Sequence, residues 1–214
     1  MTAPRLEAAG LTFRYDAATP LVEEWSASFR AGEVVGVTGP SGRGKSTLLY
    51  LLGLMLKPRA GEVRLDGVPV HGLTDGARAH LRAHNFGFVF QDAALDQSRT
   101  VLDNVLETVL YRGGDRKAST GRAEELLEQF GVSLRANAKP GQVSGGQAQR
   151  IAMCRALLGD PQVLLADEPT GNLDPESSDV VVNALHQQAA RGAAVIVVTH
   201  DPALVARCDR RIEL

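Results

Sequence analysis

The chain has 214 residues, with 23 lysines and arginines against 25 aspartates and glutamates, a formal net charge of -2 and 44% hydrophobic residues. These values are typical of one globular domain with a substantial core, and they exclude an intrinsically disordered chain. A protein that works by neutralising nucleic-acid phosphates carries a clustered basic excess, so we expect no nucleic-acid partner. The longest apolar stretch, residues 48–56, is far shorter than the roughly 20 residues that a membrane span needs.

The cell compartment is predicted from the N-terminus and from the cysteines. The first residues contain no basic segment followed by an apolar stretch, so no secretory signal is expected. Cys154 and Cys208 lie far apart in the sequence and form no Cys-x-x-Cys pattern. Both observations favour a reducing cytoplasm with packed, inert thiols.

The first third of the chain is predicted to contain antiparallel strands. Trp25, Ala27 and Phe29 alternate with polar residues, a period of two that is typical of a half-buried strand. Asp66-Gly67 lies between two short apolar stretches, which is the pattern of a β-hairpin.

Later strands are predicted to form a parallel sheet. Strands that are buried on both faces of such a sheet are short continuous apolar runs. Four runs of this kind are found, at residues 34–37, 86–90, 163–166 and 193–198. Helical patterns occupy the segment from about residue 92 to residue 158. We therefore predict an α/β fold in a single domain, residues 1–214, with a mostly parallel core sheet, an N-terminal antiparallel β region and a helical subdomain at about 92–158.

The strongest single motif follows the run at 34–37 and precedes a helical stretch at 46–56. It matches the phosphate-binding loop (P-loop) pattern G-x-x-x-x-G-K-[ST]. Its glycines let backbone N–H groups converge on phosphate oxygens, and the helix N-terminus favours an anion. Lys45 is predicted to contact the β- and γ-phosphates of a nucleotide, and Ser46 to ligate Mg²⁺. The predicted phosphate-binding residues are Gly39, Pro40, Ser41, Gly42, Arg43, Gly44, Lys45, Ser46 and Thr47.

Two adjacent carboxylates, Asp167 and Glu168, follow the buried run at 163–166. In open α/β folds, ligands bind at the carboxyl ends of the parallel strands. Adjacent acids are ordinarily a solvated strand end, but the P-loop favours a role for them at a nucleotide. Asp167 is placed to hold Mg²⁺, directly or through water, and Glu168 to polarise an attacking water. These features alone do not choose between a kinase, a GTPase and an ATPase.

The segment Val143-Ser144-Gly145-Gly146-Gln147 resembles the signature of ATP-binding-cassette (ABC) ATPases, usually Leu-Ser-Gly-Gly-Gln. A serine and two glycines at a helix start form a second anion-binding site, which one nucleotide in one chain does not need. In the ABC family, each ATP lies between the P-loop of one subunit and the signature of the other. The resemblance therefore implies that a second copy of the chain completes the site through Ser144, Gly145, Gly146 and Gln147.

The remaining ABC motifs follow in order, and the resemblance covers almost the whole chain. It implies that Gln91 contacts Mg²⁺ and the attacking water and lies where a membrane partner docks, and that His200 contacts the γ-phosphate. Tyr15 resembles the aromatic residue that stacks on adenine, with Phe13 as the weaker candidate. Asp174 resembles the aspartate that communicates across the dimer. The implied catalytic residues are Glu168, His200 and Gln91, and the implied Mg²⁺ ligands are Ser46, Gln91 and Asp167.

Within the ABC family, residues 166–174 resemble the branch of lipoprotein-releasing, macrolide and peptide exporters and the cell-division ATPase. Val143, Arg43 and Ala148 depart from the usual pattern, and we expect all three to be compatible with ATP binding. The resemblance implies an ATPase subunit that binds ATP and Mg²⁺, forms a homodimer and drives an integral membrane permease from the cytoplasmic face of the cell membrane.

Alternative functions remain at this point. A cell-division-type ATPase would transmit force through its membrane partner without moving a substrate. A soluble ABC ATPase that acts on DNA or ribosomes would be expected to carry a coiled-coil insertion, a second cassette or basic arms, and none is visible in the sequence. A small-molecule kinase would have no use for the signature at residues 144–147.

Overall fold

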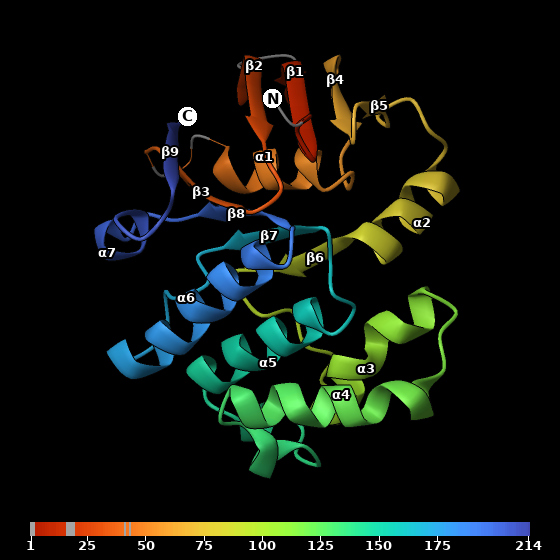
Figure 1. Ribbon diagram of the computed structural model, residues 1–214, viewed down its shortest axis with the longest axis vertical. Helices are drawn as coiled ribbons and strands as arrows, with labels where there is room; N and C mark the ends of the chain where they lie inside the picture. The colour runs from red at the N-terminus through yellow and green to blue at the C-terminus, as the bar shows by residue number, and fades with distance from the viewer. Residues whose placement is uncertain (1–2, 16–19, 41, 43) are drawn as a thin grey trace.

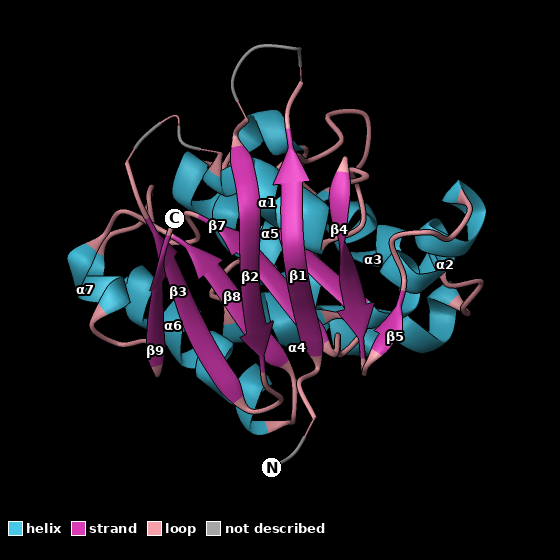
Figure 2. Ribbon diagram, turned by 90° about the horizontal axis from the view of Figure 1, so that it is seen from above, coloured by secondary structure: helices cyan, strands magenta, loops and turns pink. Residues whose placement is uncertain are grey.

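The computed structural model describes residues 3–15, 20–40, 42 and 44–214. Two β-sheets and the helices packed on them form the fold (Figures 1 and 2). Ser41 and Arg43, which are predicted to bind phosphate, lie outside the described residues.

The N-terminal sheet is antiparallel, as predicted, and Figure 2 shows its strands side by side. Its order is β2-β1-β4-β5, where the strands are β1 Leu6–Phe13, β2 Val22–Phe29, β4 Ala60–Leu65 and β5 Val68–Pro69. Asp66 and Gly67 join β4 to β5 with φ values of 49° and 79°. Aspartate and glycine tolerate this left-handed backbone, so the predicted hairpin is confirmed and its turn is explained.

The core sheet has five strands, all parallel, in the order β6-β7-β8-β3-β9. They are β3 Glu33–Thr38, β6 Phe86–Val89, β7 Val163–Asp167, β8 Ala194–Val198 and β9 Arg210–Glu213. The four apolar runs of the sequence are the four strands other than β9. The edge strand β9 is partly exposed, which explains its polar sequence.

Alternate residues of the core strands pack in two separate cores. Val34, Leu164 and Val195 contribute to the core beneath helices on one face, and Val35, Leu165 and Ile196 to the core shared with the N-terminal sheet. The second face carries helix α1 Lys45–Leu52. The first face carries α3 Val101–Tyr111, α4 Arg116–Gln129, α5 Gly145–Leu157 and α6 Pro175–Ala190. Figure 1 accordingly shows α1 and α5 on opposite sides of the core sheet.

The segment predicted to be helical, residues 92–158, contains α3, α4, two short 3₁₀ turns at Ser133–Arg135 and Pro140–Gln142, and α5, with no strand. The helices α2 Asp75–Asn85 and α7 Pro202–Val205 complete the described fold. Among the described residues, no helix is long and apolar enough to cross a membrane.

One helix is shorter than predicted. The sequence predicts a helical stretch to residue 56, but α1 ends at Leu52 with Gly53 as its C-cap. A Cβ at Gly53 would stand 2.4 Å from Phe88 Cε1 and 3.0 Å from Leu165 Cδ1. The end of α1 therefore packs directly on the core sheet, and glycine at this contact also ends the helix.

Candidate nucleotide-binding site

Two described glycines of the loop between β3 and α1 have a left-handed backbone. Gly44 has φ of 86°, and a Cβ there would stand 2.9 Å from the carbonyl oxygen of Leu21. Gly42 has φ of 75°, with no atom within 4 Å of the position of a Cβ among the described residues. Glycine is therefore needed for the backbone shape at both positions, and the space beside Gly42 is open among the described residues. This open cradle at the start of α1 fits a phosphate group.

Lys45, the first residue of α1, reaches back over the loop. Its Nζ donates hydrogen bonds to the carbonyl oxygens of Gly39 and Pro40, both at 2.9 Å. A phosphate oxygen is a stronger, charged acceptor than either carbonyl. The ammonium group is therefore positioned to exchange these bonds for bonds to a phosphate in the cradle.

A cavity of about 600 Å³ brings together the three predicted Mg²⁺ ligands, Ser46, Gln91 and Asp167. Asp167 ends β7 and is only 5% exposed, and the Ser46 hydroxyl hydrogen-bonds to its carboxylate. Burial raises the pKa of Asp167, because the carboxylate loses its hydration. A cation beside this carboxylate would offset that cost. The oxygen donors of the three side chains fit Mg²⁺, which prefers such ligands.

The other residues that line this cavity were not predicted from the sequence. They are Tyr50, Phe90, Asp92, Ala94 and Asn172. The aromatic rings of Tyr50 and Phe90 lie 6.3 Å apart, measured between their centroids. Nothing in their sequence spacing indicates this contact, since α1 and the end of β6 meet only in the folded chain.

Glu168 lies directly after Asp167 with φ of 48°, a left-handed conformation that costs about 1 kcal/mol or more for a non-glycine residue. Three contacts hold it there. Its Oε2 accepts a hydrogen bond from Thr199 Oγ1 at 3.0 Å. Its Oε1 accepts the backbone N–H of His200 at 3.0 Å and lies 2.6 Å from His200 Nδ1. Two residues predicted to be catalytic, Glu168 and His200, are therefore in direct contact.

The sheet register explains this contact. Asp167 on β7 is paired with Val198 on β8, so the residues that follow each strand emerge side by side at the carboxyl edge of the sheet. Thr199 was not among the predicted site residues. Its position between a buried strand and His200 was the only signal for it in the sequence.

His200 places a titratable ring at this edge. The hydrogen bond that the His200 ring donates to Glu168 and the negative charge of that carboxylate raise the pKa of His200. The side chain is 76% exposed, whereas that of Glu168 is 11% exposed. The ring can therefore carry positive charge at a position that an anionic ligand can reach.

The signature segment forms the beginning of α5. Ser144 is the N-cap, and its Oγ accepts the backbone N–H of Gln147 at 3.2 Å, while Gln147 Oε1 accepts the backbone N–H of Ser144 at 3.0 Å. This capping box fixes an exposed helix N-terminus. A Cβ at Gly146 would stand 3.0 Å from the carbonyl oxygen of Asn172, and Gly145 is open on the surface.

The two anion-binding features of the chain lie apart. Of the described residues, none from 144 to 147 lines the cavity that holds Ser46 and Asp167. The helices α1 and α5, whose N-termini would bind the anions, lie on opposite sides of the core sheet (Figure 1). The signature residues therefore do not line this cavity themselves, although Gly146 packs against Asn172, which does.

The two candidate adenine-stacking rings differ in exposure. Tyr15 is 61% exposed and Phe13 is 7% exposed, and the rings meet edge to face with centroids 5.0 Å apart. Phe13 belongs to the core that lies between the two sheets. Tyr15 is therefore the ring that is free to stack on a ligand, supported from below by Phe13.

Asp174 has a local role that the sequence analysis missed. It is the N-cap of α6, and its two carboxylate oxygens accept hydrogen bonds from the backbone N–H and the hydroxyl of Ser177, at 2.9 and 2.8 Å. These bonds lower the pKa of Asp174. An aspartate followed by Pro175 at the first helical position is a helix-start pattern, and that was the available signal.

Comparisons with known proteins agree with this geometry. A family model described as "ABC transporter" matches residues 22–171. The lipoprotein-releasing system ATP-binding protein LolD 1 of Rhodospirillum rubrum is 45% identical over 184 residues, which are 86% of this chain and 81% of that protein. LolD of Bordetella pertussis is 41% identical over 217 residues, covering 100% of this chain and 94% of that protein.

The macrolide export ATP-binding/permease protein MacB 1/2 of Paracoccus denitrificans is 46% identical over 183 residues. The match covers 86% of this chain but only 27% of MacB, so the chain spans about a quarter of that relative.

Two solved structures share the fold. The dimeric structure of MJ0796, a bacterial ABC transporter cassette, superposes with a TM-score of 0.92 at 33% identity, over 98% of this chain and 94% of that one. A post-hydrolysis dimer of the same cassette, bound to ADP and Pi, gives a TM-score of 0.91 at 32% identity with the same coverage. The α/β cassette with an antiparallel N-terminal sheet and a parallel core sheet is therefore confirmed.

Proposed function

The chain belongs to the ABC transporter family, and on that premise we propose that it is the ATP-binding and ATP-hydrolysing subunit of an export complex. One observation carries the proposal: Ser46, Gln91 and Asp167 come from distant parts of the chain and line the same cavity. Glu168 lies next to Asp167, in contact with His200. Residues 1–214 act as a single cassette, with the helical subdomain at about 92–158.

The phosphates are bound by the backbone of the loop 39–44 and by Lys45, whose ammonium group exchanges the Gly39 and Pro40 carbonyls for phosphate oxygens. The residues that would hold Mg²⁺ are Ser46, Gln91 and Asp167. When bound, the ion neutralises charge that develops on the phosphate oxygens during transfer. Tyr15 offers its exposed ring to the adenine.

Hydrolysis needs a base beside the attacking water, and Glu168 supplies it in this proposal. His200 presents a raised pKa and an exposed ring, so it contributes positive charge at the γ-phosphate. Most of the lowering of the barrier comes from position and charge, since the phosphoryl group needs little covalent chemistry from the protein.

A second copy of the chain completes each site. Ser144 does not line the cavity of its own chain that holds Ser46, and α5 packs on the opposite face of the core sheet from α1, so we assign the α5 N-terminus to a nucleotide on the other copy. The likeness to the dimeric MJ0796 cassette, at 33% identity, supports this arrangement. ATP then acts as the ligand that favours the closed dimer, and hydrolysis removes it.

The membrane partner is proposed to dock in a second cavity, of about 720 Å³, between α2, β6, α3 and α5. Its wall is largely apolar and aromatic, with Phe86, Phe88 and Tyr111 among the lining residues. Phe90 and Ala94 line both this groove and the cavity of the Mg²⁺ ligands. A permease seated in the groove would therefore contact the segment that carries Gln91, at the cytoplasmic face of the membrane.

Export is proposed because LolD and MacB, the relatives reported above, are named for lipoprotein release and macrolide export. The test combines the purified chain and its permease in proteoliposomes, with Mg-ATP and either a lipidated polypeptide or a macrolide as cargo. ATP-dependent movement of the macrolide across the membrane, away from the face that carries this chain, or release of the lipidated polypeptide from the membrane supports export. Hydrolysis that the permease stimulates, without cargo movement, would favour the force-transmitting alternative. An absence of Mg-dependent hydrolysis would contradict the ATPase assignment.

A further inference from the structure

The loop after Gln91 has an unusual backbone. Ala93 and Ala94 are consecutive and have φ values of 61° and 46°. A left-handed conformation costs a non-glycine residue about 1–3 kcal/mol, and it persists only where surrounding groups impose it. Ala93 is also 3% exposed, whereas Gln91, Asp92 and Ala94 are exposed, so the turn is anchored in the protein by Ala93. Groups outside the loop must therefore hold residues 91–95 in place.

Two buried side chains of α5 supply the restraint. Arg155 donates from Nη1 to the carbonyl oxygen of Ala94 and from Nη2 to that of Ala93, both at 2.7 Å. Gln149 donates from Nε2 to the carbonyl oxygen of Phe90 at 3.3 Å. Arg155 is 8% exposed and Gln149 is 1% exposed. The loop that begins with Gln91 is therefore clamped to α5 on both sides of that residue.

Within the described part of the chain, the guanidinium of Arg155 donates hydrogen bonds only to carbonyl groups and forms no ion pair. Burial of a cation without a carboxylate partner is costly. Charge-assisted bonds to two carbonyls offset this cost and fix the geometry of both. A planar fork that spans two successive carbonyls is a property of arginine that lysine lacks.

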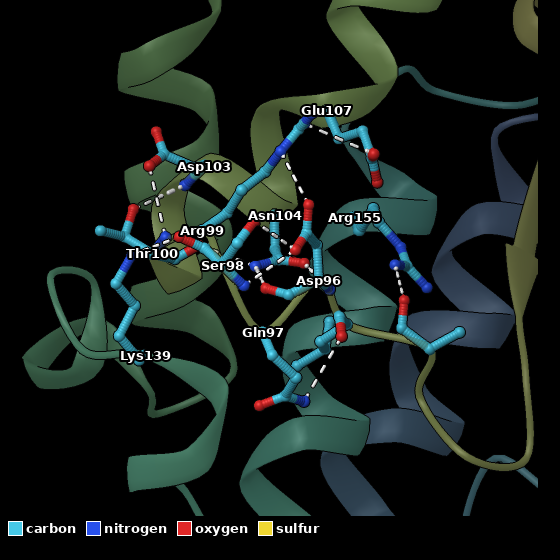
Figure 3. Close-up of polar contacts among 12 residues, drawn as sticks. Asp96, Gln97, Ser98, Arg99, Thr100, Asp103, Asn104, Glu107, Lys139 and Arg155 are labelled. Carbon is cyan, nitrogen blue, oxygen red and sulfur yellow. Dashed lines mark hydrogen bonds and ion pairs between the residues drawn. The ribbon is translucent and has the colours of Figure 1, made fainter.

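The next segment of the chain is anchored separately, as Figure 3 shows. Asn104 of α3 is fully buried, its Oδ1 accepts the backbone N–H of Asp96 at 2.7 Å, and its Nδ2 donates to the carbonyl oxygens of Asp96 and Thr100. Lys139 donates to the carbonyl oxygen of Ser98. Residues 96–100 are thus fixed to α3, and Arg155 is left as the restraint on the strained alanines.

We propose that Arg155 is a positioning residue that sets the place of Gln91 relative to the signature helix and the docking groove. Arg155 lies in the last turn of α5, whose first turn carries Ser144. Arg155 and Ala94 both line the groove, and Ala94 also lines the cavity that contains Gln91. A movement of α5, or pressure from an occupant of the groove, therefore reaches Gln91 through the same two hydrogen bonds. This inference rests on the proposed function of Gln91 at Mg²⁺ and water.

The test compares Arg155→Met, Gln91→Ala and the double variant in the full chain. For each variant, we would measure kcat, the KM for ATP and the Mg²⁺ concentration that gives half of the maximal rate. We expect Arg155→Met to lower kcat about tenfold and to raise the Mg²⁺ requirement, with KM for ATP changed by less than about twofold. Because Arg155 acts through Gln91, the double variant should have the kcat of Gln91→Ala within about twofold. Arg155→Lys, with its charge but no fork, should give an intermediate kcat.

Arg78→Met is the matched control. Arg78 of α2 is 9% exposed and donates to the carbonyl oxygen of Leu54, and it lines neither the groove nor the cavity that contains Gln91. This variant should lower Tm and leave kcat unchanged. If Arg155→Met does not fold, Arg155→Lys takes its place. The kcat of Arg155→Lys, of Gln91→Ala and of their double variant are then compared in the same way.

Two results would overturn the proposal in distinguishable ways. If Gln91→Ala lowers kcat and the double variant multiplies the two losses, Arg155 does not act through Gln91 and only the positioning role fails. If Gln91→Ala leaves kcat and the Mg²⁺ requirement unchanged, the proposed function of Gln91 fails, and the positioning role fails with it.

Discussion

His200 Nδ1 lies 2.6 Å from Glu168 Oε1, and the same oxygen accepts the His200 backbone N–H at 3.0 Å. Thr199 donates to the other carboxylate oxygen at 3.0 Å. Both carboxylate oxygens of Glu168 therefore accept hydrogen bonds from the two residues that follow β8. In the proposed function, Glu168 is the base beside the attacking water and His200 adds positive charge at the γ-phosphate, so this contact joins two groups that act on the same phosphate.

The first prediction concerns the titration of His200. Glu168→Gln removes the charge that raises the pKa of His200 above its ordinary value of 6.5, so the pKa should fall in the variant. NMR titration of the His200 ring measures it. Asp201→Asn is the control, because Asp201 is a smaller cause of the same shift and its removal should lower the pKa less. An unchanged pKa in Glu168→Gln would contradict the contact.

The same contact predicts a pH dependence of folding stability. The pKa of His200 is raised in the folded chain, so the protonated pair stabilises the fold fully below pH 6.5, the ordinary value. This contribution is lost as the pH rises through the raised pKa of the folded state. The Tm difference between the wild type and Glu168→Gln should therefore be larger just below pH 6.5 than at higher pH.

The second prediction concerns turnover by Glu168→Gln. An amide cannot accept a proton from water, so the rate of ATP hydrolysis should fall about 100-fold or more while ATP still binds. The variant should then accumulate as a dimer in size-exclusion chromatography with Mg-ATP, and light scattering measures its mass. Glu176→Gln, on the exposed first turn of α6, is the control and should behave as the wild type. A monomer with full activity would contradict the role of Glu168.

The parts of the fold that could be predicted from the sequence depend on local pattern. The hairpin at Asp66-Gly67 is marked by two residues that tolerate positive φ. The buried strands are marked by continuous apolar runs, and the P-loop by glycines at fixed spacing before Lys45. In each case, neighbouring residues alone decide the backbone geometry, so no tertiary contact is needed to predict it.

Other features depend on contacts between distant segments, and they were not predicted. Thr199 meets Glu168 only because β7 and β8 are aligned in the sheet. In the sequence, Arg155 is one polar residue in a helical stretch, and its contacts with Ala93 and Ala94 form only when α5 packs against that loop. The thiol of Cys154 follows its expected packing: it is fully buried, and burial raises its pKa.

The third prediction concerns Lys45. Hydrogen bonds to charged groups contribute about 1.5–3 kcal/mol, so Lys45→Ala should weaken nucleotide binding about 10-fold or more. A fluorescent ATP analogue measures the affinity. Lys57→Ala is the matched control, since Lys57 is exposed beyond the end of α1. This variant should bind the nucleotide as tightly as the wild type does. Equal affinity of Lys45→Ala and the wild type would exclude Lys45 from the phosphate site.

The fourth prediction separates helix capping from nucleotide contact at Ser144. Ser144 and Thr100 are both N-caps with a complete capping box, on α5 and α3. Replacing either by alanine should cost about 1 kcal/mol of stability, seen as a similar loss of Tm. Only Ser144→Ala should also lose ATPase activity, because only that helix N-terminus is proposed to face a nucleotide. Equal activity losses in the two variants would assign the effect of Ser144 to capping alone.

The last prediction tests which chain supplies the signature to each nucleotide. Lys45→Ala and Ser144→Ala should each be inactive alone, because every site in either homodimer carries one defect. We propose that each site combines the P-loop of one copy with the α5 N-terminus of the other. In a heterodimer of the two variants, one site then contains both substitutions and the other site contains neither. An equimolar mixture should then recover about a quarter of the wild-type activity, if the subunits exchange freely and the sites act independently. Sites built within one chain would carry one defect each in every dimer, so a mixture without recovered activity would contradict the shared site.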